Sequence, residues 1–511
     1  MLIHRLRDYF HVFLLALLAL AISLGWFALD GNVNVNLSDE GYLWYGTTAL
    51  RHGQVPMRDF QAYDPGRYVW TAAWSFILGE NLSAMRLACV LFQCLGVTAG
   101  CLAARRLSRS AIFLACVALM LCAWMQPRYK VFEQSIALTF ILGGVLLLER
   151  PTIRRHFAAG ILGGAMAFFG RNHGAYHVVA FALMIAWSAR GERAGEWLHR
   201  GAVWCGGLLC GYMPQWFMFL FVPGYFRAFA ANLADVFKHG TNLPMPVPWP
   251  WCVSPEWTHW VRWLALAEGG VFVAIPAFLL LAATLAASRR RALHSVLVSA
   301  ACVTLPYSHY AFSRPDLVHL GHCAPALALG FLALGFAGSS RVGFTFAGMA
   351  LIASTLANLR EIGAAIALFT EPHSLSAVHL AGGKMIALHE EAAAIAAAQK
   401  LDAELVAPDE PILFLPNLPG LYPVVRRFSP TRNIYFIFPA TPDEDRAALA
   451  EIPTADVRWV MLRDYALDGR DELRFSNTNP IVSQYLRENF EPVPMAGLPP
   501  DTIILHRTPN P

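Results

Sequence analysis

Residues 10–45 read FHVFLLALLALAISLGWFALDGNVNVNLSDEGYLWY, a long apolar run followed by a polar loop that contains an acidic pair. A helix needs about 20 mostly apolar residues to cross a bilayer, and the run at 10–29 has that length. The run is too long for the core of a signal peptide, and Asp30, Gly31 and Asn32 follow it in place of a small-residue cleavage site. We therefore expect it to remain in the protein as a membrane anchor.

The rest of the chain divides into an apolar body and a charged tail. Hydrophobic residues make up 56% of the 511 positions and charged residues 14%, whereas soluble chains have about 25% charged residues. Residues 371–511 carry 12 Lys+Arg and 19 Asp+Glu, and residues 1–370 carry 27 and 16. The overall charge of +4 hides this asymmetry, and we expect no nucleic-acid partner. The composition excludes a soluble enzyme, a disordered protein and a fibrous protein.

A scan for apolar runs, including short or interrupted ones, gives eleven candidate spans. They are 10–29, 82–104, 110–126, 133–149, 156–170, 174–189, 199–222, 263–287, 292–309, 321–338 and 341–359. The predicted fold class is therefore an α-helical polytopic membrane protein that is surrounded by membrane lipids.

The arginines assign the two sides of the membrane. With a cytoplasmic N-terminus, the dense Arg clusters of the eleven-span topology all fall in cytoplasmic loops, which agrees with the positive-inside rule. These loops contain Arg5, Arg7, Arg105, Arg106, Arg109, Arg150, Arg154, Arg155, Arg190, Arg193, Arg200, Arg289, Arg290, Arg291 and Arg341. An odd number of spans places the tail on the other side. We predict a plasma-membrane protein (inner membrane in a bacterium) with a periplasmic or extracellular C-terminal domain.

The tail over 371–511 is predicted to be a small α/β domain that follows a transmembrane domain over 1–370. Its strand-like stretches are Pro411–Leu415, Asn433–Phe438, Val457–Leu462 and Thr502–His506. Its helix-like stretches are Ile386–Val406, Asp443–Glu451 and Ile481–Phe490. Neither common type of glycine-rich phosphate loop is present.

The outer loops have their own character. In the loop 30–81, the stretches 40–52 and 66–79 have helical patterning and enough aromatic residues to lie along the membrane interface. The loop 223–262 is rich in Trp and Pro, which is typical of an interfacial belt. The ten cysteines lie almost entirely in apolar runs, without CxxC or Cys/His spacing, so we expect neither a disulfide framework nor a structural metal.

Two polar stretches in the loop 30–81 are candidates for the site. Asp39 and Glu40 stand at the start of a predicted helix, just before Tyr42. Ser38 or Asp39 can cap that helix, and Glu40 suits its dipole. Alternatively, Asp39 acts as a general base on a hydroxyl. The second stretch runs from Asp59 to Tyr68 and includes Asp64 and Arg67; it is either a Pro-Gly turn with a capping Asp64 or a part of the site.

A third group is mainly cationic and falls in short outer loops, against the usual bias. It consists of Arg128, Lys130, Arg171, His173, Arg314, Asp316, His319 and His322. Either these cations pair internally with acidic residues, or they bind a phosphate at the membrane surface. Asp316, His319 and His322 offer three metal ligands without a fourth at recognisable spacing, so a divalent cation is possible but no cofactor is assigned.

The order of these features resembles the GT-C glycosyltransferases, in particular the group of protein O-mannosyltransferases and bacterial aminoarabinose transferases. A first helix is followed by the acidic pair Asp39-Glu40, by aromatic residues and by two interface helices. Gly53, Pro56 and Arg86 belong to the same pattern. Where several relatives have Lys-Pro-Pro, this chain has the stretch 63–66, Tyr-Asp-Pro-Gly, which leaves the sugar open.

The resemblance implies an enzyme that transfers a sugar from a polyprenyl-phosphate carrier to a hydroxyl of a lipid, glycan or protein outside the cytoplasm. Asp39 would deprotonate the acceptor, with inversion at the anomeric carbon, and Glu40 would orient the acceptor or the sugar. The substrate-binding candidates are Tyr42, Asp64, Arg67, Arg128, Lys130, Arg171, His173, Arg314 and His319. A lipid or glycan transporter and a ligase or polymerase of lipid-linked glycans are the alternatives.

Overall fold

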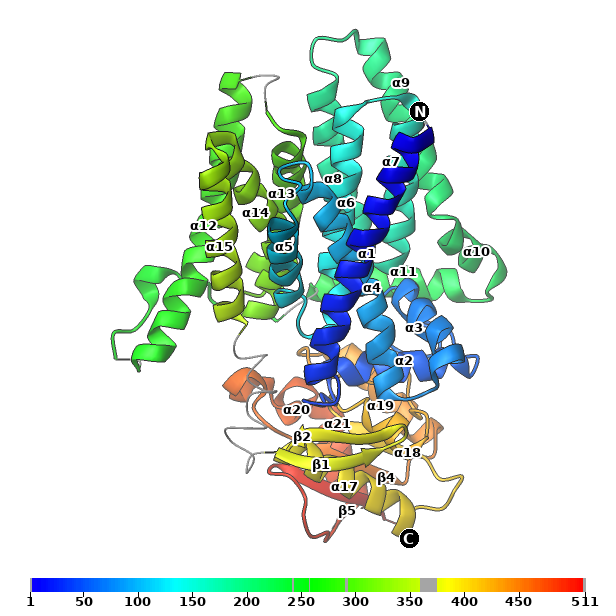
Figure 1. The fold of residues 1–511 in the computed structure, drawn as a ribbon. Coiled ribbons are helices and arrows are strands. Elements are labelled where there is room, and N and C mark those ends of the chain that lie inside the picture. Colours follow the sequence, from blue (N-terminus) through cyan, green and yellow to red (C-terminus); the bar gives the residue numbers. More distant parts are fainter. Residues whose placement is uncertain (1, 241–242, 257, 290–292, 359–374, 509–511) are drawn as a thin grey trace. The chain divides into compact units, whose positions relative to one another are not determined.

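The computed structural model describes residues 2–240, 243–256, 258–289, 293–358 and 375–508, and the chain forms two compact units (Figure 1). Unit 1 comprises Met1–Ala28, Cys89–Phe221 and Asn242–Gly363. Unit 2 comprises Leu29–Ala88, Val222–Thr241 and Ala364–Pro511. Unit 2 thus combines the loop after the first helix with the tail. The predicted domain boundary between 370 and 371 lies outside the described residues.

Unit 1 is a bundle of helices. Six helices in the described chain are long and apolar enough to cross a membrane, or seven if the broken pair Met213–Phe221 and Tyr225–Lys238 is one span. The protein is thus an integral, multi-pass membrane protein. The helices that lie wholly or partly in this unit are α1 (Leu2–Asp30), α4 (Leu82–Ala104), α5 (Ala111–Ala123), α6 (Val131–Glu149), α7 (Ile153–Phe169), α8 (Arg171–Ser188), α9 (Ala194–Gly211), α10 (Met213–Phe221), α12 (His259–Arg289), α13 (Ser295–Ser313), α14 (Leu317–Gly338) and α15 (Ser340–Ala357), with the short helices η1 (Arg128–Lys130) and η2 (Pro250–Cys252).

Each of the eleven predicted runs overlaps one of these helices, although the number of membrane crossings stays a prediction. The run 199–222 differs from the prediction, since α9 ends at Gly211 and α10 begins at Met213. Pro214 lacks the backbone N–H that a continuous helix would need there, but it fits the first turn of a new helix. Residue 292, the first of the run 292–309, and residue 359, the last of the run 341–359, lie outside the described residues.

Two glycine pairs set the close packing of α7 against α9. Gly160 and Gly164 of α7 face α9, where Gly207 and Gly211 recur at the same four-residue spacing. A Cβ on Gly160 would lie 2.1 Å from the Trp204 carbonyl oxygen, a distance that real side chains do not reach. Small residues at this spacing let two membrane helices approach with their backbones in contact.

The first part of unit 2 contains α2 (Asp39–Arg51) and α3 (Pro65–Leu78), which confirms the two helices predicted in the loop 30–81. The Thr47 and Thr71 hydroxyls share a hydrogen bond of 2.7 Å between these helices. Gly46 allows the Tyr68 ring to pack closely on α2, because a Cβ there would lie 2.2 Å from that ring. A further helix, α11 (Tyr225–His239), comes from the predicted loop 223–262.

The tail forms the predicted α/β fold. Its four-stranded sheet has the order β3 (Ile412–Leu415), β4 (Trp459–Arg463), β6 (Thr502–Arg507), β5 (Phe490–Val493), with β3 and β4 parallel and the other pairs antiparallel. The strands β1 (Leu375–Leu380) and β2 (Gly383–Leu388) form a separate hairpin. The helices are α17 (His389–Glu404), α18 (Leu421–Val425), α19 (Pro442–Thr454), α20 (Phe475–Thr478) and α21 (Pro480–Asn489), with the short helices η4 (Leu467–Gly469) and η5 (Asp471–Leu473). Buried apolar residues from the sheet and from α19 and α21 make one core.

Two predicted elements of the tail need correction. The segment 433–438 is an irregular segment and not a strand, because the Tyr435 N–H donates to the Gln61 side chain and the Phe436 N–H to the Pro416 carbonyl. The helix predicted over Ile386–Val406 begins at His389, since residues 386–388 pair with β1 as the end of β2. In both cases hydrogen-bond partners outside the predicted element take the backbone groups.

Candidate functional site

Asp39 lies at the start of α2, where its carboxylate meets a side chain from the tail. The Tyr435 hydroxyl donates a hydrogen bond to Asp39 Oδ1. Ser38 occupies the N-cap position, but its hydroxyl donates to the Asn417 carbonyl oxygen at 2.6 Å and makes no capping hydrogen bond to the described chain. The helix start thus connects Asp39 and Ser38 to two separate segments of the tail.

Tyrosine rings pack together next to the contact between Asp39 and Tyr435. The Tyr42 ring lies one turn further along α2 and packs against the Tyr63 and Tyr435 rings, with centroids 4.8 and 5.1 Å apart. The Arg67 guanidinium lies over the Tyr63 ring at 5.0 Å from its centroid. The arrangement brings Asp39, Tyr42 and Arg67, three of the predicted site residues, into one cluster of polar and aromatic groups.

Asp64 stands beside this cluster, between Tyr63 and α3. It occupies the N-cap position of α3, as the capping alternative predicts, with an extended backbone and Pro65 as the next residue. Its side chain makes no capping hydrogen bond to the described residues. The predicted turn is therefore present, while the Asp64 carboxylate is largely buried and does not cap the helix.

Glu40 points to a different place from Asp39. Its two carboxylate oxygens accept hydrogen bonds of 2.6 Å each from Nε and Nη2 of Arg86, in a bidentate ion pair. Both side chains are buried, with exposed fractions of 3% and 4%. Arg86 also donates to the carbonyl oxygens of Gly31, Val33 and Asn34. This pair therefore fixes the loop between α1 and α2.

The cationic residues of unit 1 lie in turns that meet at one end of the bundle. The Arg128 guanidinium reaches the last part of α1, where it donates to the Trp26 carbonyl oxygen at 3.3 Å. The start of α8 meets the end of α13, because His173 Nδ1 shares a hydrogen bond of 2.9 Å with the Tyr307 hydroxyl. Since α helices in a bundle alternate in direction, the predicted outer turns gather at the same end.

Two further cations occupy the same turns. Lys130 follows Arg128 in η1, with its ammonium 5.9 Å from the centroid of the Tyr129 ring. Arg171 is the first residue of α8, directly after the N-cap residue Gly170. Arg128 itself is almost fully buried and lies over the Phe27 ring at 5.1 Å.

Arg314 and His319 form an internal network around Asp316. Arg314 Nε lies 2.8 Å from one Asp316 oxygen, and His319 Nδ1 lies 2.7 Å from the other. Burial opposes ionisation of Asp316, but the hydrogen bonds from His319 and the charge of Arg314 hold its pKa below the usual range. Asp316 also caps α14, since it accepts from the His319 backbone N–H. Arg314 thus makes the internal ion pair that the sequence analysis gave as one of its two alternatives.

The two histidines suggested as metal ligands lie close together. The His319 and His322 rings lie 5.4 Å apart, and the Tyr310 ring packs on His322 at 4.8 Å. Among the residues that the structure describes, no group of three His, Cys, Asp or Glu side chains is arranged to hold a metal ion.

The sequence analysis missed several residues of these clusters. Tyr435 lies about 400 positions after Asp39, in a segment whose pattern indicates a strand, so no local signal connects the two. Tyr63 stands in the quoted loop, but nothing in its spacing marks it as a partner of Arg67. Tyr307 lies inside the predicted span 292–309 and Tyr310 directly follows it, and at both places an aromatic residue is typical of ordinary packing.

Comparisons with known proteins address the fold. No protein-family model and no curated protein sequence matches the chain. Its structure is similar to the crystal structure of ArnT from Cupriavidus metallidurans bound to undecaprenyl phosphate, with a TM-score of 0.53, 13% sequence identity and 97% of each chain covered. The apo ArnT structure gives a TM-score of 0.54 and 13% identity over 98% of each chain. The chain therefore has the fold of ArnT over nearly its whole length, which confirms the predicted fold class of a polytopic helical membrane protein with a C-terminal α/β domain.

Proposed function

We propose that this membrane protein is a glycosyltransferase that moves a sugar from a polyprenyl-phosphate carrier to a hydroxyl of a lipid, glycan or protein acceptor. The fold supports the proposal, because the ArnT structure with the same fold contains undecaprenyl phosphate. The observation that carries it is the position of Asp39 at the start of α2, within a cluster of polar and aromatic side chains.

In the proposed reaction Asp39 is the general base. The acceptor oxygen attacks the anomeric carbon as its proton passes to the Asp39 carboxylate. The bond between the anomeric carbon and the phosphate oxygen breaks, and its electron pair leaves with the polyprenyl phosphate. Attack opposite to the leaving group inverts the anomeric carbon. The hydrogen bond from Tyr435 orients the carboxylate.

The neighbouring acid has a different proposed role. The bidentate contact of Glu40 with Arg86 supports a positioning role, in which Glu40 holds the start of α2 and thereby the Asp39 carboxylate. Tyr42, Asp64 and Arg67 are the proposed sugar- or acceptor-binding groups of unit 2. Their support is their position around Tyr63, beside Asp39.

The proposed phosphate-binding residues are Arg128, Lys130 and Arg171, with His173 beside them. A leaving phosphate gains negative charge as its bond to the sugar breaks, and fixed cations stabilise that charge. The support is that these residues lie in turns at one end of the unit 1 bundle. Arg314 and His319 belong to the same group, with the Asp316 network to orient them. We further propose that the N-terminus is cytoplasmic and that residues 371–511 form an extracytoplasmic domain.

Product analysis separates this proposal from a transporter. The purified protein is reconstituted in liposomes with a polyprenyl-phosphate sugar whose sugar carries an isotope label, together with a panel of lipid and glycan acceptors. If the protein is a transferase, mass spectrometry detects an acceptor that is heavier by one labelled sugar, together with free polyprenyl phosphate. Movement of intact lipid-linked sugar across the bilayer without a new glycosidic bond would contradict the proposal. Comparison of surface glycans and lipids from cells with and without the protein identifies the native acceptor.

A further inference from the structure

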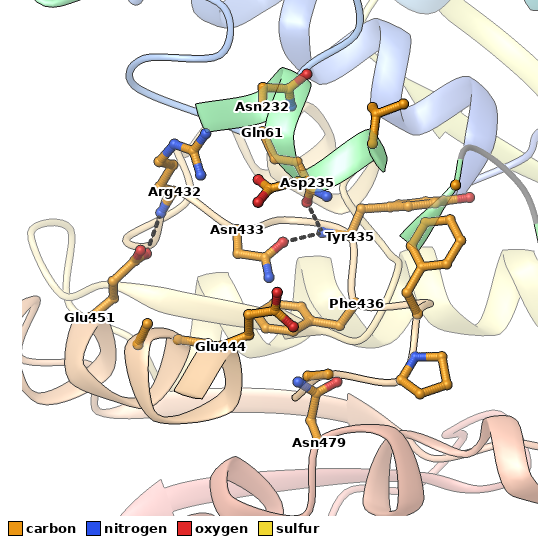
Figure 2. A pocket seen from close by; sticks show the side chains of 17 residues that line it. Gln61, Asn232, Asp235, Arg432, Asn433, Tyr435, Phe436, Glu444, Glu451 and Asn479 are labelled. Carbon is orange, nitrogen blue, oxygen red and sulfur yellow. Dashed lines mark hydrogen bonds between the residues drawn. The ribbon is translucent and has the colours of Figure 1, made fainter. Parts of the chain in front are cut away.

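Unit 2 contains a cavity of about 400 Å³ that none of the assignments above uses. It lies between α11, the segment 432–440 and α19, and Gln61 and Asn479 complete its wall (Figure 2). The volume falls in the usual range of sites for small ligands, roughly 300–1,000 Å³. All of the lining residues belong to the same compact unit.

The wall is rich in amide groups. Gln61, Asn232, Asn433 and Asn479 line the cavity from four separate segments of the chain. An amide carries both donors and acceptors, so it can match a hydroxyl group in either direction. The rings of Tyr435, Phe436 and Phe438 add apolar faces to the same wall. A lining with many amides and a few rings suits a ligand that has several hydroxyl groups and apolar C–H faces, as a sugar does.

Several polar groups of the wall are held in place by the protein itself. Gln61 Oε1 accepts from the Tyr435 N–H at 3.1 Å, and Glu451 accepts from the Arg432 N–H at 2.6 Å. Glu444 belongs to the capping box of α19. These contacts fix the shape of the wall before a ligand arrives, which reduces the ordering cost of binding.

Asp235 of α11 is the carboxylate of the cavity that the protein leaves available. It is exposed, and no hydrogen bond or ion pair joins it to the rest of the described chain. Figure 2 shows the Asp235, Asn433 and Glu444 side chains directed toward one space. The Asp235 carboxylate is therefore placed to accept hydrogen bonds from a ligand in that space.

The charges of the wall select against anions. Asp235, Glu444 and Glu451 contribute three carboxylates, whereas Arg432 is the one cation among the lining residues. The Arg432 guanidinium donates to the Met57 carbonyl oxygen at 2.9 Å, and Lys238 at the margin lies 3.4 Å from Glu444. The three carboxylates therefore outnumber the two cations, Arg432 and Lys238. A phosphate or a carboxylate-bearing sugar is therefore disfavoured, and a neutral or amine-bearing sugar is favoured.

We propose that this cavity binds an uncharged or amine-bearing sugar unit of the acceptor, which rests on the glycosyltransferase function proposed above. Tyr435 connects the cavity to the reaction, because it lines the wall and its hydroxyl donates to Asp39. The acceptor is favoured over the donor, because the donor sugar is attached to an anionic phosphate and to an apolar lipid that this wall does not match.

Binding is tested without turnover, so that its failure is distinct from a failure of the transferase proposal. Saturation-transfer NMR on the purified full-length protein in detergent compares methyl glucoside, glucosamine and glucuronate as probes. We expect the first two to bind and glucuronate to bind several-fold more weakly. Asn433→Ala should weaken the binding of both methyl glucoside and glucosamine by roughly two- to ten-fold. Asp235→Asn should weaken the binding of glucosamine by roughly two- to five-fold and leave the binding of methyl glucoside nearly unchanged.

The matched control is Asp409→Asn, which removes the same charge from an exposed turn outside the cavity and should change nothing. Asp235→Asn alters an exposed side chain, so it tests the proposal even if Asn433→Ala fails to fold. Equal or tighter binding of glucuronate, or no binding of any probe, would overturn the proposal. Displacement of methyl glucoside by a polyprenyl-phosphate sugar would assign the cavity to the donor and overturn the acceptor assignment.

Discussion

At the scale of single residues, the adjacent acids Asp39 and Glu40 have opposite surroundings. Successive residues of a helix point about 100° apart, so the two carboxylates at the start of α2 face different sides. Glu40 enters a buried ion pair with Arg86, and Asp39 meets the Tyr435 hydroxyl. One acid therefore fixes the backbone while the other is presented to the aromatic cluster, and their substitution should have different consequences.

We expect Glu40→Gln to destabilise unit 2. The change leaves the buried Arg86 guanidinium without its counter-charge, which costs about 3–5 kcal/mol in comparable pairs. The control is Glu404→Gln, since the exposed Lys400–Glu404 pair contributes at most about 1 kcal/mol. The unfolding free energies of both variants are measured by denaturant titration of the purified protein. Limited proteolysis of the tail serves as the probe of unfolding. Equal unfolding free energies for the two variants would contradict the structural role of Glu40.

Glu391 of α17 makes the stability of unit 2 depend on pH. Burial raises the pKa of Glu391 from its usual 4.5 to about 7, although the positive charge of Arg463 opposes the shift. The folded protein therefore binds this proton more tightly than the unfolded chain, and its unfolding free energy falls as the pH rises from about 4.5 to about 7. Glu391→Gln should remove this decline, which amounts to at most about 3 kcal/mol. An unchanged pH dependence of thermal unfolding between pH 5 and pH 8 would exclude the assignment.

Asp39 could be singled out from sequence because it stands in a distinctive order of local features. The partner Tyr435 could not, since a hydrogen bond between residues almost 400 positions apart depends on the tertiary fold. For the same reason the sequence left two explanations open for Arg314, and its ion pair with Asp316 emerges only when both side chains have coordinates.

At the scale of elements, the packing of α7 on α9 depends on glycines. A Cβ on Gly207 would lie 2.2 Å from the Phe157 carbonyl oxygen, whereas Gly201 of the same helix has open space around it. We expect Gly207→Ala to force the helices apart and to destabilise unit 1 by about 1–3 kcal/mol. Gly201→Ala should be neutral or slightly stabilising, because alanine is the better helix former. Thermal unfolding in detergent compares the two, and equal effects would contradict the packing described here.

The predictability of an element follows from where its hydrogen bonds are made. Helices α2 and α3 satisfy their own backbone groups, and the periodicity of their side chains was enough to predict them. The segment 433–438 has the alternation of a strand, yet its N–H groups go to Gln61 and Pro416. The hairpin β1–β2 was missed because residues 386–388 precede an alanine-rich helix, and their pattern merges with it.

At the scale of the whole molecule, the arginine pattern predicts an odd number of membrane crossings. We predict that a reporter fused after residue 511 is active only outside the cytoplasm. Paired fusions at this position, one to a reporter that is active in the periplasm and one to a reporter that is active in the cytoplasm, decide the question. The loop around Arg105 and Arg106, which is predicted to be cytoplasmic, serves as the internal reference, and a fusion there should give the opposite pair of signals. A cytoplasmic signal from residue 511 would exclude the eleven-span topology.

The overall architecture was predictable because it depends on order and composition. Long apolar runs, an acidic loop after the first of them and a charged tail are visible without coordinates. The division into compact units was not predictable, since unit 2 is assembled from three segments, 29–88, 222–241 and 364–511, that are far apart in the chain. The cavity beside Tyr435 needs all three segments and has no signal in any one of them.

The most direct test of the account is sugar transfer by Asp39→Asn. Asparagine has nearly the same shape and keeps an oxygen that can accept the Tyr435 hydrogen bond, but it cannot take the proton of the acceptor. A general base contributes roughly 10²–10⁴-fold to rate. With Asp409→Asn as the control, initial rates are measured on purified protein with a polyprenyl-phosphate sugar and its acceptor. The account predicts a loss of at least about 100-fold at an unchanged unfolding temperature, and near-normal transfer by Asp39→Asn would contradict it.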